Sequence, residues 1–263
     1  MTHSLTLKKL QHMKHQNEPI CALTCYDSSF AYHLNKAQIE LVLVGDSLGQ
    51  VIQGHDSTIP VSVNDICYHT RAVRQQLSYS FLMADIPFLA QATLERALQA
   101  AQAIMQAGAQ MVKLEGGTWL IPIIQHLTNC GVPVCAHLGY TPQSVHAFSG
   151  PKLIGKQEHQ AHELIESAHK LCEAGAAILV LECVPDALAE TLSKELPCPV
   201  IGIGAGPGCD GQILVSYDLL GLTPQGIPPF AECFLNETFP SIIEAICAYR
   251  TAVKTGTFPT PRS

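Results

Sequence analysis

Charged residues are scarce in this sequence of 263 residues. Lys, Arg, Asp and Glu together make up 14% of the chain, whereas apolar residues make up 47%. This composition favours a large buried core and argues against disorder. The formal net charge is −7 and the basic residues form no stripe, which argues against a nucleic-acid partner.

The eleven cysteines form no C-x-x-C pair, and their number is odd. Several lie in apolar segments, where a free thiol packs as a small hydrophobic side chain. This pattern argues against a disulfide framework and predicts reduced thiols in a cytoplasmic protein. The polar N-terminus lacks the apolar core of a signal peptide, and no segment approaches the roughly 20 apolar residues of a membrane span, so no membrane partner is expected.

Short apolar runs recur along the chain, with helical patterns between them and a short helix expected before the first run. Most runs are almost continuously apolar, as expected for parallel strands buried on both faces. Residues 93–107 and 158–174 have apolar residues at spacings of three and four, which predicts helices. Eight runs can close a (β/α)8 TIM barrel, an α/β fold, and no linker divides the chain, so residues 1–263 are interpreted as one domain. The runs cover residues 20–26, 41–46, 79–86, 111–115, 133–138, 177–183, 199–204 and 213–217.

Five of these runs carry an ionisable residue at their last or next-to-last position. The carboxyl ends of the strands of a parallel barrel meet at one rim, so these side chains are expected to gather there. Four carboxylates, a lysine and a histidine in one place are typical of a metal site with acid–base groups. The residues are Asp46, Asp85, Glu115, His137 and Glu182, with Lys113 just inside the third run.

Alternation along a strand places Lys113 and Glu115 on one face and Leu114 on the other. If that face points into the barrel, the two form a buried pair. This pair is either a structural ion pair, or it places Glu115 near a metal and Lys113 near an anionic oxygen. Glu182 follows a long apolar run, so desolvation should raise its pKa and suit it to proton abstraction.

Structural roles stay open for the other residues of the cluster. Asp46 and Asp85 could each cap a turn after a strand. His137 could be a core histidine held by hydrogen bonds, and Glu182 could be a buried cap or one partner of an ion pair.

Glycines at 202, 204 and 206 do not complete the dinucleotide-binding pattern G-x-G-x-x-G, because Pro207 and Cys209 stand where a third glycine is needed. They are interpreted as leaving room for a bound molecule. No Walker loop or nucleophile motif competes with the carboxylate cluster, whose open coordination positions suit Mg²⁺. A metal chelated by a 2-oxo acid polarises the ketone, so the residues alone indicate metal-assisted enolisation of a small keto acid.

Longer segments of the sequence resemble the ketopantoate hydroxymethyltransferase family, in order, from about residue 20 to about residue 235. These segments are V-G-D-S-L-G at 44–49, G-H-D-S-T-I-P at 54–60, A-D-I-P-F at 84–88, V-K-L-E-G-G at 112–117, H-L-G-Y-T-P-Q-S-V at 137–145, L-E-C-V-P at 181–185, I-G-I-G-A-G at 201–206 and D-G-Q at 210–212. Several of them are long enough to be specific in combination.

The resemblance implies transfer of a hydroxymethyl group from 5,10-methylenetetrahydrofolate to 3-methyl-2-oxobutanoate. The product would be 2-dehydropantoate, on the route to pantothenate and coenzyme A. The resemblance also implies Mg²⁺, a barrel of the phosphoenolpyruvate-mutase type and a homo-oligomer, in this family often a decamer.

The resemblance also implies roles for individual residues. Asp46 and Asp85 would hold the metal, and Glu115 would complete its shell. Glu182 would be the general base. The keto acid would be bound by Asp46, Ser47, Asp85 and Lys113, with His137 near its carboxylate.

One segment departs from the family pattern. After Val145 the family usually continues with an asparagine and Phe-Gly-Gly-Tyr-Lys, whereas residues 146–152 read H-A-F-S-G-P-K. A proline and a lost glycine stiffen this loop, which bears on loop closure or contact with the folate.

Two rival interpretations stay open. One is a lyase of the same superfamily that cleaves a carbon–carbon or phosphorus–carbon bond, although the Lys-Lys-Cys-Gly-His loop of enzymes resembling isocitrate lyase is absent. The other is a barrel retained as a binding or scaffold protein. The intact Asp46, Asp85, Glu115 and Glu182 argue against it.

Overall fold

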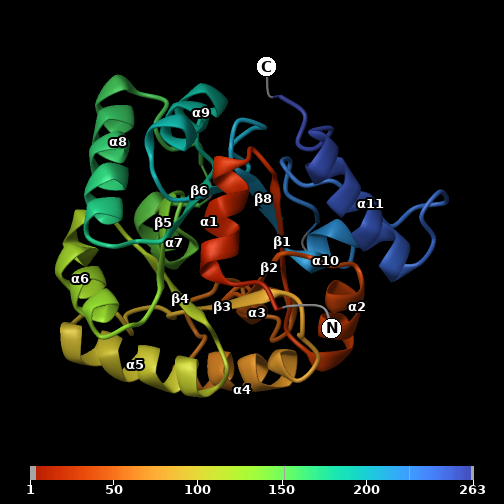
Figure 1. Cartoon of the computed structure of the whole chain (residues 1–263), viewed down its shortest axis with the longest axis horizontal. Helices are drawn as coiled ribbons and strands as arrows, with labels where there is room; N and C mark the ends of the chain where they lie inside the picture. Colours follow the sequence, from red (N-terminus) through yellow and green to blue (C-terminus); the bar gives the residue numbers. More distant parts are fainter. Residues whose placement is uncertain (1–3, 151, 225, 262–263) are drawn as a thin grey trace.

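The structure, a computed structural model, describes residues 4–150, 152–224 and 226–261. In these residues eight parallel strands close into a barrel, each paired with its neighbours in the sequence and β8 paired with β1 (Figure 1). The predicted (β/α)8 barrel is therefore confirmed, whereas its description as one domain over residues 1–263 stays a prediction. The strands are β1 Ile20–Thr24, β2 Leu41–Val44, β3 Phe81–Asp85, β4 Met111–Glu115, β5 Val134–Gly139, β6 Ile178–Glu182, β7 Val200–Ile203 and β8 Gly211–Leu214.

Helices connect the strands, except between β7 and β8, and cover the outside of the barrel (Figure 1). None of the helices in the described ranges has the length and apolar character needed to cross a membrane. Short 3-10 turns cover Thr118–Leu120 and Pro142–Ser144. The helices are α1 Leu7–His15, α2 Ser28–Lys36, α3 Leu48–Val51, α4 Val63–Arg74, α5 Leu94–Gln106, α6 Ile121–Asn129, α7 Val145–Phe148, α8 Glu158–Glu173, α9 Asp186–Glu195, α10 Ser216–Leu219 and α11 Ile242–Thr255.

Both helices predicted from spacing are present, and α5 has the expected ends. The hydroxyl of Thr93 accepts a hydrogen bond from the backbone N–H of Arg96, which satisfies one of the unpaired donors at the helix start. Gly108 lies just beyond the last turn with φ +113°, a conformation that side-chain-bearing residues rarely adopt. Gly175 has φ +112° after α8 in the same way.

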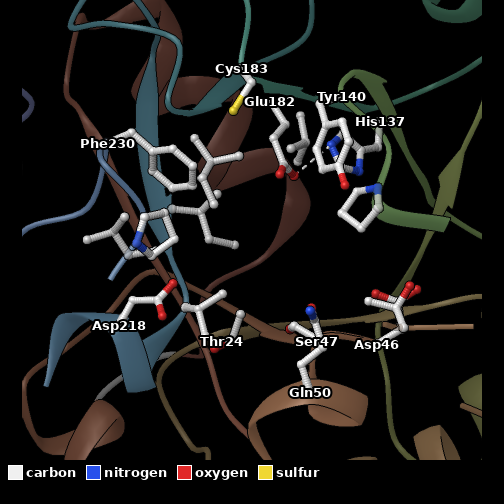
Figure 2. A pocket seen from close by; sticks show the side chains of 18 of the residues that line it. Thr24, Asp46, Ser47, Gln50, His137, Tyr140, Glu182, Cys183, Asp218 and Phe230 are labelled. Atoms are coloured by element: carbon white, nitrogen blue, oxygen red, sulfur yellow. Dashed lines mark ion pairs between the residues drawn. The ribbon is translucent and has the colours of Figure 1, made fainter. Parts of the chain in front are cut away.

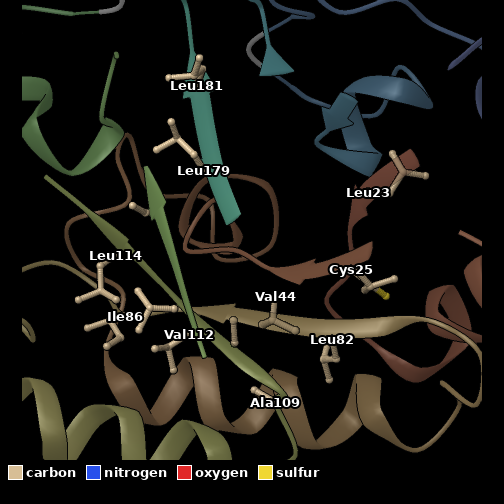
Figure 3. Close-up of a cluster of buried hydrophobic side chains, with 14 of the residues drawn as sticks. Leu23, Cys25, Val44, Leu82, Ile86, Ala109, Val112, Leu114, Leu179 and Leu181 are labelled. Atoms are coloured by element: carbon tan, nitrogen blue, oxygen red, sulfur yellow. The ribbon is translucent and has the colours of Figure 1, made fainter. Parts of the chain in front are cut away.

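The pleat of the strands divides the buried apolar side chains into two sets. The outward-pointing set packs under the helices and includes Leu23, Val44, Leu82, Val112 and Leu114 (Figure 3). This outer core is continuous around the barrel, because successive strand side chains point to opposite faces and every second one meets a helix.

The inward-pointing set fills the barrel and includes Leu41, Met83 and Met111. Helix α1 adds Leu10 and Met13 to this inner core, both essentially inaccessible to solvent. Lys14 Nζ of α1 lies 2.6 Å from Asp210 Oδ2, just before β8 begins. The predicted N-terminal helix therefore closes the barrel where the strands start, which leaves the opposite end free for a site.

The last strand was predicted in the wrong place. The sequence interpretation put it at 213–217, whereas β8 spans Gly211–Leu214 and residues from Ser216 are helical. A side chain at Gly211 would place its Cβ 2.3 Å from the carbonyl oxygen of Ile20, so glycine lets β8 approach β1 closely. At the other end, the Ser216 N–H donates to Thr24 Oγ1 instead of continuing the ladder.

Candidate active site

Near the carboxyl ends of the strands, the inward-facing positions change from apolar to ionisable. On β4, Met111 belongs to the inner core, while Lys113 and Glu115 follow on the same face and line a cavity. The same step occurs on the neighbouring strands, in the pairs Met83 and Asp85, Cys135 and His137, and Val180 and Glu182. The regular pleat thus carries the ionisable residues to one end of the barrel.

The cavity at this end has a volume of about 770 Å³ (Figure 2). All the site residues predicted from the sequence line it, so the expected gathering at one rim is confirmed. They are Asp46, Ser47, Asp85, Lys113, Glu115, His137 and Glu182.

Lys113 and Asp85 form a buried ion pair across neighbouring strands. Lys113 Nζ lies 2.6 Å from Asp85 Oδ1 and 3.6 Å from Glu115 Oε1. Burial disfavours the charged ammonium, but Asp85, Glu115 and Asp46 outweigh that effect and raise the pKa of Lys113. The other oxygen of Asp85 accepts the Asp46 N–H at 2.9 Å, which fixes the β2 loop to β3.

Glu115, His137 and Glu182 form a second chain of contacts. His137 Nδ1 lies 3.2 Å from Glu115 Oε1, and Nε2 lies 3.3 Å from Glu182 Oε2, poorly aligned for a hydrogen bond. Burial and the Lys113 charge oppose protonation of His137, yet the two carboxylates raise its pKa to about 9. Desolvation raises the pKa of Glu182, and the contact with His137 only partly offsets it. The prediction that burial would raise the Glu182 pKa is confirmed.

Gln143 is a central residue of the site that the sequence analysis did not single out. Its side-chain amide donates to Asp46 Oδ2 at 2.9 Å, and its backbone N–H donates to Glu115 Oε2 at 3.0 Å. Gln91 donates to Gln143 Oε1 at 3.1 Å and so orients the amide. Its place in the long T-P-Q-S-V segment six residues after His137 is the sequence signal that could have indicated it.

Ser47 is held by Tyr26, which lies just after the end of β1. Tyr26 Oη and Ser47 Oγ lie 2.8 Å apart, and the Tyr26 carbonyl lies 2.6 Å from His69 Nδ1. Tyr26 is 2% exposed, so its phenol is a fixed support for the Ser47 hydroxyl at the cavity wall.

The carboxylates of Asp46, Asp85 and Glu115 are all buried in one part of the cavity. Burial, followed by the charges of Asp85 and Glu115, raises the pKa of Asp46 well above its usual value, and Lys113 only partly compensates. This excess of acidic oxygen is the environment that a hard divalent cation stabilises.

The fit of this site to Mg²⁺ rests on its oxygen donors. Within the described ranges, no three His, Cys, Asp or Glu side chains are arranged together as a metal cage. Mg²⁺ needs only one or two carboxylates, because it keeps several waters and takes oxygens from the substrate. Asp46 and Asp85, tied together by a hydrogen bond, match that requirement.

The alternate glycines at 202, 204 and 206 do not line the cavity, contrary to the prediction that they leave room for a ligand. A Cβ at Gly202 would lie 2.9 Å from Cys209 Sγ, and one at Gly206 would lie 2.3 Å from the Asp186 carboxyl carbon. Gly202 and Gly206 therefore permit close packing within the fold.

The segment that departs from the family pattern lies beside the cavity. Lys152 lines it, and its Nζ lies 4.9 Å from the centre of the Phe148 ring. The Phe148 ring in turn packs against Tyr140, with centroids 5.6 Å apart. The predicted stiffening by Pro151 falls outside the described residues.

Gly139 is a position where a small change should disturb Glu182. Its φ is +93°, and a Cβ there would lie 2.2 Å from the backbone oxygen of Glu182. We expect Gly139→Ala to lower the denaturant midpoint and to reduce turnover, because β6 must shift at its catalytic end. Gly131→Ala is the matched control, since Gly131 has φ +84° and open space around its Cβ position.

In the control, the free energy of unfolding should fall only by the cost of backbone strain at positive φ, about 1–3 kcal/mol. Chemical denaturation and turnover of both variants measure the difference. Equal losses of stability and activity in the two variants would contradict the expected displacement of Glu182.

Comparison with known proteins decides the family. Residues 4–261 match the family model described as ketopantoate hydroxymethyltransferase. The chain belongs to this family. It is 50% identical over 256 residues to 3-methyl-2-oxobutanoate hydroxymethyltransferase 2 of Hahella chejuensis, with 97% of each chain covered. It is 51% identical over 255 residues to 3-methyl-2-oxobutanoate hydroxymethyltransferase of Shewanella sediminis, with 97% of this chain and 96% of that protein covered.

Solved structures share the fold of this ketopantoate hydroxymethyltransferase family member at low sequence identity. Phosphonopyruvate hydrolase is 15% identical with a TM-score of 0.63, over 96% of this chain and 98% of that one. A 2,3-dimethylmalate lyase of the PEP mutase/isocitrate lyase superfamily is 16% identical with a TM-score of 0.60, over 95% and 97%. These similarities confirm a barrel of the phosphoenolpyruvate-mutase type.

Proposed function

We propose that this protein transfers a hydroxymethyl group from 5,10-methylenetetrahydrofolate to 3-methyl-2-oxobutanoate, giving 2-dehydropantoate for pantothenate synthesis. Membership of the family and the names of its relatives support the reaction. The observation that carries the mechanism is the division of the acidic groups. Asp85 pairs with Lys113 and accepts the Asp46 N–H, whereas Glu182 contacts only the imidazole of His137 among the salt bridges of the described ranges.

The keto acid is proposed to bind over Asp46, Ser47 and Asp85, where Mg²⁺ would be held with Glu115 in its outer shell. Bound there, Mg²⁺ would act as a Lewis acid that withdraws electron density from the 2-oxo group. Lys113 is a fixed cation beside these carboxylates, so it favours the negative charge that grows on the substrate oxygens. The His137 imidazole, with its raised pKa, would attract the substrate carboxylate.

Glu182 is proposed to remove the C3 proton of the keto acid. The C–H electron pair then forms the C2–C3 double bond, and the negative charge moves to the ketone oxygen. C3 bonds to the methylene carbon of the folate as the ketone re-forms, one carbon–nitrogen bond of the folate breaks, and that nitrogen takes up the proton. Water then replaces the second nitrogen at this carbon, giving the carbon its hydroxyl and the nitrogen its proton, so that tetrahydrofolate leaves. The raised pKa of Glu182 brings this carboxylate closer to neutral pH, where a general base is most effective.

The test of this function is exchange of the C3 hydrogen in D₂O. With Mg²⁺ and 3-methyl-2-oxobutanoate, the protein should replace this hydrogen by deuterium, whether or not folate is present. Proton NMR measures the loss of the C3 hydrogen signal. A lyase would instead split its own substrate and leave this keto acid unchanged, and a scaffold protein would do neither. Exchange no faster than in buffer would refute the proposed function.

We also propose that the protein is a cytoplasmic homo-oligomer. Cys21, Cys25 and Cys135 are buried thiols outside any disulfide, which agrees with a reducing compartment. The oligomer rests on the family resemblance alone, and sedimentation velocity would measure its size.

A further inference from the structure

The cavity is larger than a small keto acid requires. Cavities of about 300–1,000 Å³ hold drug-sized ligands, and this one measures about 770 Å³. The ionisable residues occupy the rim from β2 to β6. The opposite side, formed by the ends of β7, β8 and β1, is left for a second molecule.

This second side has a different chemistry. Its walls are mainly apolar and come from the ends of β7 and β8 and from the segment 226–230. They include Ile203, Ile213, Leu214, Ile227 and Phe230. Figure 2 shows the Phe230 ring on the side of the pocket away from Asp46 and His137. Because β8 lies four strands from β4 in the closed barrel, the two sides face each other across the cavity.

Asp218 brings a carboxylate to these mainly apolar walls. It belongs to α10, directly after β8, and is 5% exposed although it lines the cavity. The Thr223 hydroxyl donates to Asp218 Oδ1. Asp218 Oδ2 has neither a hydrogen-bond donor nor a cationic partner among the described residues. Burial raises the pKa of Asp218, and the bond from Thr223 only partly offsets this effect.

We propose that Asp218 binds the pterin ring of the folate donor by accepting hydrogen bonds from its N3–H and 2-amino groups. This inference rests on the proposed function and adds the position of the second substrate. A carboxylate only accepts hydrogen bonds, and N3–H and the 2-amino group form a donor pair on one edge of the pterin. Such charge-assisted, paired bonds are among the strongest in proteins.

The rest of this side suits a flat heterocycle. The ring faces would lie against apolar side chains and Phe230, which aromatic groups prefer. The keto acid, by contrast, carries a carboxylate that Asp218 would repel. The two substrates would therefore be sorted to opposite sides of the cavity by charge, with the reacting carbons between them.

The test compares binding of tetrahydrofolate to wild-type protein and to Asp218→Asn by isothermal titration calorimetry. The asparagine keeps the shape but presents an NH₂ group to the pterin donors. We expect affinity to fall on the order of 10- to 100-fold, the loss typical of charge-assisted hydrogen bonds. Asp56→Asn is the matched control, because Asp56 is an exposed carboxylate at the same cavity, and it should bind tetrahydrofolate like the wild type.

A second probe needs no variant. Wild-type protein should bind tetrahydrofolate more tightly than its 2-desamino-2-methyl analogue, which lacks the amino donor, and Asp218→Asn should lose this preference. Equal binding of the two ligands by the wild type, or unchanged tetrahydrofolate affinity in Asp218→Asn, would overturn the inference. Exchange of the C3 hydrogen by the wild type with keto acid alone separates this outcome from failure of the proposed function.

Discussion

Glu182→Gln is expected to slow exchange of the C3 hydrogen by about 10²–10⁴-fold, the usual contribution of a general base. The glutamine keeps the size of the side chain and loses only the proton acceptor. His137 Nε2 lies 3.3 Å from the Glu182 carboxylate and can meet the amide oxygen instead, so the cavity wall should persist. Exchange in D₂O and hydroxymethyl transfer should fall together, because proton removal precedes transfer.

The variant should still bind Mg²⁺ and the keto acid, because Asp46, Asp85 and Lys113 remain. Glu173→Gln, a carboxylate at the end of α8 that does not line the cavity, is the control and should exchange at the wild-type rate. If Glu182→Gln exchanges deuterium as fast as the wild type, another group is the base and the assignment is wrong.

Asp85→Asn is expected to abolish Mg²⁺-dependent activity. Asp85 accepts the Asp46 N–H and faces Lys113 Nζ at 2.6 Å, so it both orients the proposed metal site and neutralises the lysine. The amide preserves the shape, and Glu115 remains 3.6 Å from Lys113 as a partner for its charge. Chelation by EDTA should abolish the activity of the wild type, and added Mg²⁺ should restore that activity.

Binding of Mn²⁺, followed by electron paramagnetic resonance, measures the site without turnover. The wild type should bind Mn²⁺, Asp85→Asn should bind it at least tenfold more weakly, and Asp56→Asn should match the wild type. Full activity after thorough chelation, or unchanged Mn²⁺ affinity in Asp85→Asn, would contradict a metal held by Asp46 and Asp85.

The sequence predicted the fold and the site where the strands are regular. Apolar runs identified seven strands to within two residues at either end, and their common direction placed Asp46, Asp85, Glu115, His137 and Glu182 at one rim. Period-two alternation also predicted that Lys113 and Glu115 share a face. These features follow from local geometry, which a single sequence records.

Features that depend on contacts between distant segments could not be read in the same way. β8 begins at a glycine because a Cβ at Gly211 would collide with the carbonyl oxygen of Ile20, which is far away in the sequence. Gln143 joins Asp46 to Glu115 only once three segments that are distant in the sequence have come together. Asp218 lies just after β8, the strand whose bounds were predicted wrongly, so its position at the cavity was not predicted.

Transfer of carbon from the folate to the keto acid tests the central claim most directly. The protein would be incubated with Mg²⁺, 3-methyl-2-oxobutanoate and 5,10-methylenetetrahydrofolate labelled with ¹³C at the methylene carbon, and followed by ¹³C NMR. The account predicts that the label appears in the hydroxymethyl carbon of 2-dehydropantoate and that Glu182→Gln nearly abolishes this signal. If the folded wild-type protein leaves the label on the folate while the keto acid stays unchanged, the account is contradicted.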